Sequence, residues 1–453
     1  MAVVGLAVTA VVVLALLVGV HRYLWRRFVG DTTAEGSALR RAGTVAAYLL
    51  PLLSVGALVS GRTGAPFWLQ QVLAWPGYLW LAALLYLTLA LLVGEVARPV
   101  LRRVLAGRAN ESSRLNRRSV TKVLTPEATD APAADAHATD APAADVLVAD
   151  APAADVLVAD APAADVLVAD APIADTLAAP TRRLFVARAV GGAAAVAGLG
   201  TVGYGTYGVL RGPRVKRITV PLAKLPRSAH GFRIAVVSDI HLGPVLGRAH
   251  TQRIVDTINR TQPDLVAVVG DLVDGTVADL GPAAEPLAQL TARQGSFFVT
   301  GNHEYYSGAA QWVDHVRELG LHPLENARVE IDGFDLAGVN DIAGESEGQG
   351  PDFDRALGDR DRNRAAVLLA HQPVVIHDAV AHGVDLQLSG HTHGGQLWPG
   401  NFIAELANPT VAGLDRYGDT QLYVSRGAGA WGPPVRVGAP SDVTVVELAS
   451  RQA

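Results

Sequence analysis

Four long apolar runs constrain the fold of this chain more than any other feature of its sequence. The first, residues 2–20, contains no charged side chain over 19 positions. As a helix it would be about 28 Å long, close to the thickness of the hydrocarbon core of a bilayer. Residues 43–60 and 72–94 form two similar runs, and residues 189–210 form a fourth that is richer in glycine and alanine. We therefore predict four transmembrane helices.

The basic residues around these runs predict their orientation. Three of the helices fall within residues 1–95 and the fourth within 182–210. Arginines are concentrated after the first and third runs, whereas only Arg62 lies between the second and third. The positive-inside rule then places the first and third connections in the cytoplasm and the C-terminal part outside. A basic cluster at 211–217 favours the opposite orientation.

The two runs with alternative explanations are the first and the fourth. The alternative for the first run is a cleavable signal peptide. Against it, no positive charge precedes the run and no clear small-x-small cleavage site follows it. The fourth begins with TRRLFVARAVGG, in which paired Arg182 and Arg183 resemble a twin-arginine export signal. Otherwise the two arginines only flank a transmembrane helix. Both alternatives for the fourth run favour a multi-pass protein of the bacterial cytoplasmic membrane with an extracytoplasmic C-terminal domain.

A tandem repeat of period ten lies between the third and fourth runs. Residues 96–181 form the predicted cytoplasmic loop, and residues 130–179 within it contain ten aspartates and no lysine or arginine. A proline in every unit prevents a long helix, and each unit offers too little apolar surface for a core. We predict an acidic, semi-extended linker.

Charge and cysteine content exclude several functions. The net charge of −5 argues against general nucleic-acid binding. Because the chain has no cysteine, disulfides, thiolate zinc sites and a cysteine nucleophile are excluded. No obligate protein partner and no organic-cofactor site are apparent.

Residues 217–453 have the composition of an α/β domain, in which short apolar runs alternate with amphipathic stretches. Helical periodicity is present around 248–261 and 309–319. The pattern predicts eight strands, at 232–238, 264–269, 296–300, 334–339, 365–370, 384–388, 421–425 and 443–448.

Metal-ligating side chains follow five of these predicted strands. In open α/β sheets, ligands gather beyond the carboxyl ends of the strands. The side chains there are oxygen and nitrogen donors suited to Mn, Fe, Zn or Mg. One divalent ion would use three or four donors, so seven donors fit two ions that share a bridging carboxylate. The seven are Asp239, His241, Asp271, Asn302, His371, His391 and His393.

The order of these blocks, D-x-H, G-D-x-x-D, G-N-H-E, H and G-H-x-H, resembles the calcineurin-like metallophosphoesterase family across most of residues 230–450. The resemblance implies a four-layer αββα sandwich and two-metal hydrolysis of a phosphodiester, phosphomonoester or pyrophosphate by a bridging hydroxide. The tail YVSRGAGAWGPPVRVG at 423–438 looks like a membrane-anchored bacterial branch related to the UDP-2,3-diacylglucosamine pyrophosphohydrolases. By analogy, the substrate is a lipid-linked or cell-envelope phosphate compound.

The resemblance also assigns roles to individual residues. It gives the first ion to Asp239, His241 and His393 and the second to Asn302, His371 and His391, with Asp271 shared by both. His303 would act on the substrate, by stabilising phosphoryl charge or by protonating the leaving oxygen.

Other polar residues near the blocks have open interpretations. Asp274 either orients a ligand or caps the next segment, and Glu304 is interpreted as structural. Arg426 and Arg436 are candidates for contact with a substrate phosphate. The remaining histidines of the domain match no block and are interpreted as ordinary surface or helix residues: His230, His250, His315, His322, His377 and His382.

The alternative to an enzyme is a non-catalytic metal-binding interaction module on the membrane. Such a module would be expected to have lost some of the donors, and none of the seven is missing here. Transport by the helical part is disfavoured, because the three N-terminal runs contain no intramembrane ionisable residue.

Overall fold

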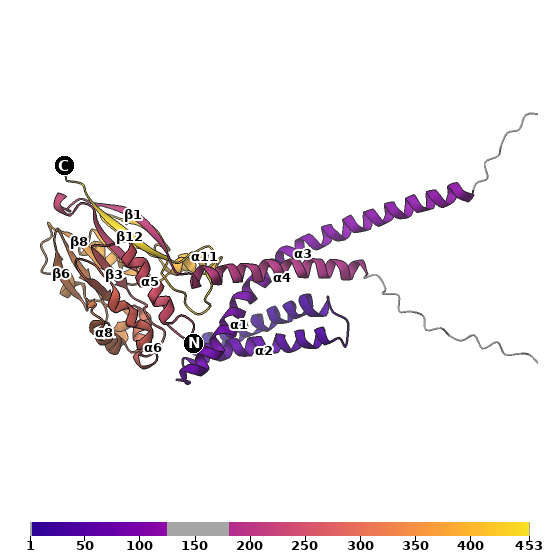
Figure 1. The fold of residues 1–453 in the computed structure, drawn as a ribbon, viewed down its shortest axis with the longest axis horizontal. Coiled ribbons are helices and arrows are strands. Elements are labelled where there is room, and N and C mark those ends of the chain that lie inside the picture. Colours follow the sequence, from indigo (N-terminus) through magenta and orange to yellow (C-terminus); the bar gives the residue numbers. More distant parts are fainter. Residues whose placement is uncertain (1, 125–180, 453) are drawn as a thin grey trace, which may run out of the picture. The chain divides into compact units, whose positions relative to one another are not determined.

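The computed structural model describes residues 2–124 and 181–452, so the repeat predicted at 130–179 lies outside the described residues. The chain divides into two compact units, one of Met1–Ala97 with Ala187–Ala453 and the other of Arg98–Val186. Four long helices precede the first strand (Figure 1): α1 (Ala2–Trp25), α2 (Ala38–Ser60), α3 (Phe67–Leu124) and α4 (Arg182–Leu210).

Three helices of the described residues are long and apolar enough to cross a membrane, judged by length and composition: Ala38–Ser60, Phe67–Ser112 and Arg182–Leu210. They correspond to the second, third and fourth apolar runs. The first run forms α1, as predicted for its secondary structure, and its membrane crossing stays a prediction.

The helices of the first unit pack through polar contacts as well as apolar side chains. The Ser54 hydroxyl of α2 donates to the Gly77 carbonyl of α3 at 2.8 Å. Trp80 Nε1 of α3 donates to His21 Nε2 of α1 at 3.1 Å. Farther along α3, Glu95 pairs with Arg27, whose Nε lies 2.8 Å from the carboxylate. These contacts hold α1, α2 and the first part of α3 together.

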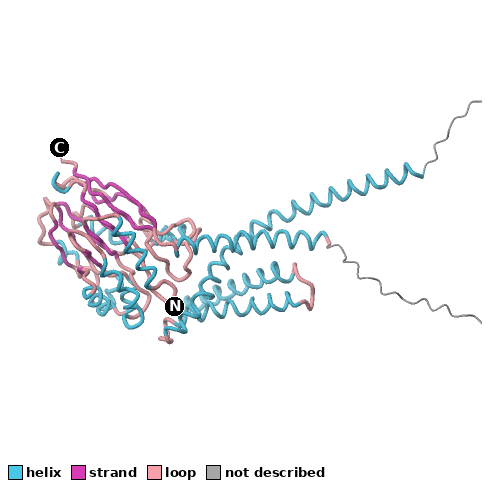
Figure 2. Tube along the Cα trace, in the orientation of Figure 1, coloured by secondary structure: helices cyan, strands magenta, loops and turns pink. Residues whose placement is uncertain are grey.

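Within residues 2–124 and 181–452, every strand follows α4, and the strands form two six-stranded mixed sheets (Figure 2). The first sheet has the order β1-β12-β2-β3-β4-β5, in which only the β12–β2 pair is antiparallel. Its strands are β1 (Arg214–Leu222), β2 (Phe232–Val237), β3 (Leu265–Val269), β4 (Ser296–Val299), β5 (His322–Pro323) and β12 (Asp442–Ser450).

The second sheet has the order β10-β11-β9-β8-β7-β6 and is parallel from β11 to β7. Antiparallel strands pair at both of its edges. Its strands are β6 (Ala327–Ile331), β7 (Phe334–Gly338), β8 (Ala365–Leu369), β9 (Leu386–Ser389), β10 (Gly413–Tyr417) and β11 (Thr420–Val424).

Alternating side chains of each strand enter different cores, as the period of two in a strand requires. Val236 of β2 and Val367 of β8 belong to one buried cluster that draws on both sheets. Val237 of β2 instead packs in a cluster with Trp312, and Leu368 of β8 packs with Ile376. The helices that follow α4 are α5 (Arg248–Arg260), α6 (Val277–Ala284), α7 (Asn302–Ser307), α8 (Ala309–Glu318), α9 (Phe353–Leu357), α10 (Ile376–Ala381) and α11 (Gly400–Ala407).

The eight predicted strands are confirmed within two residues at each end, as are the helices predicted at 248–261 and 309–319. The sequence did not predict β1, β5, β6 and β10. β1 begins at Arg214, three residues before the predicted start of the domain at 217, where Arg214 pairs with Asp442 of β12.

Candidate metal centre

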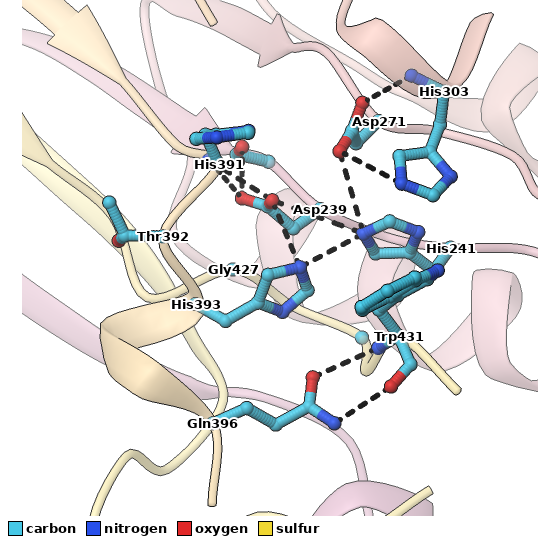
Figure 3. A network of polar contacts seen from close by, with 12 residues as sticks. Asp239, His241, Asp271, His303, His391, Thr392, His393, Gln396, Gly427 and Trp431 are labelled. Carbon is cyan, nitrogen blue, oxygen red and sulfur yellow. Dashed lines mark hydrogen bonds and ion pairs between the residues drawn. The ribbon is translucent and has the colours of Figure 1, made fainter. Parts of the chain in front are cut away.

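The predicted donors meet where strands of both sheets end. Asp239 and His241 follow β2, Asp271 follows β3, and Asn302 begins α7 just after β4. From the second sheet, His371 follows β8, and His391 and His393 follow β9. Figure 3 shows Asp239, His241, Asp271, His391 and His393 directed toward one another. The structure therefore brings together all seven residues predicted from separated blocks.

One group consists of Asp239, His241 and His393, whose ligand atoms lie within 4.8 Å of one another. The two histidine Nε2 atoms are 3.0 Å apart, and His393 Nε2 is 3.3 Å from Asp239 Oδ1. Two ring nitrogens and a carboxylate oxygen this close are the donor set of a first-row divalent cation.

A second group consists of Asp271, His371 and His391. His371 Nε2 is 3.1 Å from Asp271 Oδ2, and His391 Nδ1 is 3.1 Å from the side-chain oxygen of Asn302. Asp271 Oδ2 also lies 3.7 Å from His241 Nε2 of the first group. Asp271 is therefore placed between the two groups.

The ring of His371 tests whether this arrangement fits a cation. Its Nδ1 lies 2.9 Å from the Val269 carbonyl, which can only accept, so Nδ1 carries the proton. In the neutral ring, the buried Nε2 presents a lone pair, and it makes no hydrogen bond of normal geometry among the described residues. A lone pair aimed at the Asp271 carboxylate needs a positive charge between them, which a divalent ion supplies.

Burial and neighbouring charges shift the pKa values of His241 and Asp271 in opposite directions, and the charges prevail. Burial would lower the pKa of His241, but the carboxylates of Asp274, Asp271 and Asp239 outweigh it and raise that pKa to about 9. Burial would raise the pKa of Asp271, yet His371 and His241 hold it below its usual range. The buried carboxylate of Asp271 thus depends on nearby positive charge, which protons on His371 and His241 provide when no metal does.

The backbone of the donor loops is strained. Five donors have positive φ: Asp239 at 52°, His241 at 49°, Asp271 at 53°, His391 at 71° and His393 at 53°. Side-chain-bearing residues rarely adopt this region, and such outliers concentrate at functional sites.

Two glycines of the predicted motifs are required by close packing. A Cβ on Gly390 would lie 1.7 Å from Ser238 Oγ and 2.4 Å from Asp239 Oδ2. A Cβ on Gly301 would lie 2.3 Å from Asp271 Oδ1. These glycines let the carboxylates of both groups approach the neighbouring loops.

Asp274 contacts two histidines of the site. Of its two interpretations, these contacts favour the orientation of a ligand over the capping of the next segment. Its Oδ1 lies 2.9 Å from His241 Nδ1 and 2.7 Å from His303 Nδ1. Burial would raise the pKa of Asp274, but His241 and His303 lower it to about 2. The carboxylate therefore fixes the rings so that both Nε2 atoms face the cluster.

Glu304 is structural, in agreement with its interpretation from the sequence. The side chain is fully buried and accepts hydrogen bonds from the backbone N–H groups of Asp271, Leu272 and Gly301. Burial, and next the charge of Asp271, raise its pKa to about 7. It holds the β3 loop against the β4 loop.

Arg436 does not face solvent, contrary to the expectation that it contacts a substrate phosphate. Its side chain is buried, and its Nη2 lies 3.0 Å from His393 Nδ1. Its Nε and Nη1 donate to the carbonyls of Gly429, His393 and Ala439. Its backbone N–H donates to the Gly205 carbonyl of α4 at 3.3 Å. No local pattern around Arg436 predicted this bond to His393, because the two residues are 43 positions apart.

His303 lies at the edge of the cluster. Its side chain is 16% exposed, and its Nε2 is 4.0 Å from Asp271 Oδ2. Its ring packs edge-on against exposed Trp431, with 5.8 Å between centroids. His303 also forms a third group with His241 and Asp271, so its position allows both metal binding and contact with a substrate.

Among the unassigned histidines, His250 is a helix residue, in agreement with its interpretation, but it is not exposed. It lies in α5, but its ring is buried and neither ring nitrogen has a hydrogen-bond partner in the described residues. Arg426 remains partly exposed beside the cluster.

Residues 232–395 match the family described as calcineurin-like phosphoesterase. A transmembrane protein with metallophosphoesterase domain from Danio rerio is 39% identical over 259 residues, which cover 54% of this chain and 59% of that protein. The chain thus spans less than two thirds of the length of this relative.

An uncharacterized metallophosphoesterase from Helicobacter pylori is 38% identical over 256 residues, covering 55% of this chain and 68% of that protein. Among solved structures, a dimetal phosphatase from Danio rerio is 12% identical and covers 49% of this chain and 93% of its own, with a TM-score of 0.33.

Proposed function

Because the chain belongs to the calcineurin-like metallophosphoesterase family, we propose that it is a membrane-anchored, metal-dependent phosphoesterase. The observation that carries the proposal is the position of Asp271, whose Oδ2 lies 3.1 Å from His371 and 3.7 Å from His241. A carboxylate between two histidine groups is suited to two cations that share it. Each sheet shares one buried cluster with the other sheet and packs its opposite face against helices. This packing supports a four-layer αββα arrangement for the domain.

We assign the residues as follows. Asp239, His241 and His393 would hold one cation, Asn302, His371 and His391 would hold the other, and Asp271 would serve both. When bound, two divalent ions would polarise the phosphoryl group and activate water at neutral pH. Mn, Fe, Zn and Mg all suit these donors.

The chain's own residues supply orientation and a proton. Asp274 fixes His303 through Nδ1, which leaves Nε2 directed toward the cluster and available to donate to the leaving oxygen. Arg436 holds His393 from the other side through its main chain, because its Nη1 donates to the His393 carbonyl at 3.1 Å. The substrate class follows the resemblance of the 423–438 tail, and we propose a lipid-linked or cell-envelope phosphate ester.

The test measures hydrolysis and metal content together. The full chain in detergent, loaded with manganese, should hydrolyse bis(p-nitrophenyl) phosphate. Asp271→Asn should lose activity and about one equivalent of metal, whereas exposed Asp332→Asn should keep both. His303→Ala should lose activity but keep its metal. A chain that binds two ions and has no turnover with monoesters, diesters or pyrophosphates would instead be the non-catalytic module.

We also propose that the C-terminal domain is extracytoplasmic and that α1 is a fourth membrane helix. Loop residues 26–37 would then be cytoplasmic. The chain has no native cysteine, so a single introduced thiol reports topology directly. An impermeant maleimide added to intact cells should label Asp332→Cys but not Thr33→Cys. The reverse labelling pattern would show that the topology is opposite to the one proposed.

A further inference from the structure

A cavity of about 290 Å³ lies beside the metal centre and is not used by the proposed chemistry. It touches the centre at Gly394, which directly follows His393. Its wall has a polar and an apolar part, including Arg426, Asn401, Trp398, Val411 and Val437. The cavity is therefore adjacent to one end of the donor cluster.

The polar part is suited to an anionic group. Arg426 is about one-third exposed, and its Nη1 is 4.0 Å from the nearest carboxylate oxygen, on Asp442, which is too far for a hydrogen bond. The Asn401 side-chain oxygen is buried and has no partner among the described residues. A guanidinium with spare donors binds phosphate well, and a buried amide oxygen needs a donor such as a hydroxyl.

The apolar part continues onto helix α11, which has no buried residue. Phe402 is 57% exposed, Ile403 72% and Leu406 88%, and Trp398 just before the helix is 51% exposed. We call these four residues the apolar lip. A contiguous exposed apolar group of this kind marks an interaction surface.

The apolar lip adjoins the candidate membrane helices. Tyr86 of α3 donates its hydroxyl hydrogen to the Trp398 carbonyl at 2.9 Å. Leu397 and Val437 pack in the same apolar cluster as Leu87 of α3 and Val202 of α4. The surface is thus continuous with helices suited to a bilayer, and amphipathic helices with tryptophan at one end are typical of membrane interfaces.

We propose that the cavity and the apolar lip form a lipid-binding subsite, occupied by a bilayer lipid with a phosphate-bearing head group. The acyl chains contact the lip, the anionic head group contacts Arg426, and the phosphate ester reaches the donor cluster past Gly394. This inference rests on the proposed function for the reaction, but the contact between the lip and the bilayer is testable without turnover.

The first experiment measures bilayer contact in the full chain reconstituted in nanodiscs. Brominated phospholipids quench tryptophan fluorescence on contact, and Trp398→Phe should remove part of the quenched signal. Trp312→Phe is the matched control, because Trp312 is fully buried in the C-terminal domain and should contribute only unquenched signal. Equal quenched fractions in wild type and Trp398→Phe would overturn the proposal.

The second experiment compares two substrates, dioleoyl phosphatidic acid in nanodiscs and soluble bis(p-nitrophenyl) phosphate. Replacing Phe402, Ile403 and Leu406 by serine should lower the lipid-to-soluble ratio of kcat/KM by about tenfold. Serine at exposed Val374 and Val380, on another part of the domain, should leave that ratio unchanged.

Arg426→Gln should raise KM for the lipid more than KM for the soluble ester. If the lip variant leaves the lipid-to-soluble ratio of kcat/KM unchanged, the lipid-binding subsite is refuted, but the proposed esterase activity is not. If neither substrate turns over, the proposed function fails and the quenching result still decides the bilayer contact. If the lip variant converts a dimer to a monomer with unchanged quenching, the lip is covered by a second copy and the proposal is refuted.

Discussion

Replacing Gly390 by alanine should damage the metal centre through one methyl group. The added Cβ would stand 1.7 Å from Ser238 Oγ and 2.4 Å from Asp239 Oδ2. Ser238 cannot easily yield, because its hydroxyl also donates to the Val269 carbonyl at 2.9 Å. Asp239 in turn accepts from the backbone N–H of His391 at 3.1 Å. The strain therefore reaches donors of both groups.

The size of the effect follows from these contacts. Restoring an ordinary contact requires shifts of about 1.5 Å, whereas a functional constellation tolerates roughly 0.5 Å. Misplacement by about 1 Å costs on the order of 100-fold in rate. Overpacking of this kind lowers the free energy of unfolding by about 1–3 kcal/mol. Activity should therefore fall much more than stability.

The assay uses the full chain and measures bound metal, kcat/KM for bis(p-nitrophenyl) phosphate and the midpoint of thermal unfolding. Gly247→Ala is the control, because Gly247 precedes α5 with φ of −115° and its Cβ would meet nothing within 4 Å. The control should change stability by less than about 0.5 kcal/mol. Gly390→Ala with metal content and kcat/KM within a factor of two of the control would refute the reasoning.

Three further predictions concern residues around the centre. Asp274→Asn removes the charge that fixes His241 and His303, so metal affinity by competitive chelation should fall about 10- to 100-fold. An equal loss in exposed Asp332→Asn would contradict this. Glu304→Gln turns an amide N–H₂ toward backbone donors and should lower the free energy of unfolding by about 1–3 kcal/mol in thermal denaturation. Burial, with Arg253 and Arg436 nearby, lowers the pKa of His250 to about 4, so the folded state resists protonation relative to an unfolded pKa of about 6.5. The contribution of neutral His250 to the free energy of unfolding is complete above pH 6.5 and falls by about 3 kcal/mol as the pH approaches 4. His250→Leu should therefore flatten the pH dependence of the unfolding midpoint. An unchanged slope in this variant would contradict the prediction.

The parts of the fold that the sequence predicted are those with strong local signals. The central strands are buried on both faces and read as continuous apolar runs, as in LVAVV at Leu265–Val269. Their donors are recognisable because a polar residue follows each run at once. The strand β1 escaped prediction because RVKRITVPL intersperses three basic residues with apolar ones just after α4, a candidate membrane helix. The basic residues at 211–217 were interpreted instead as a charged cluster that flanks the fourth apolar run.

The contacts that the sequence could not predict join residues distant along the chain. Asp274 was ambiguous because its role depends on His303, 29 positions later, which it meets at 2.7 Å. Arg436 was a candidate substrate ligand because a loop arginine is usually solvated, yet pairing with carbonyls and His393 buries it. The helix α11 has an apolar sequence that locally resembles a core segment, and its exposure depends on what packs nearby.

The path from Gly205 through Arg436 to His393 has a consequence for any form of the protein shed from the membrane. Gly205 accepts the backbone N–H of Arg436, and the space a Cβ would need at Gly205 is filled by Val435 and Arg436. Proteolysis between α4 and β1 would take away this carbonyl and this close contact. Arg436 would then hold His393 less firmly. If α4 anchors the proposed phosphoesterase in a membrane, shedding would release a weakened centre, and full activity would be confined to the anchored chain.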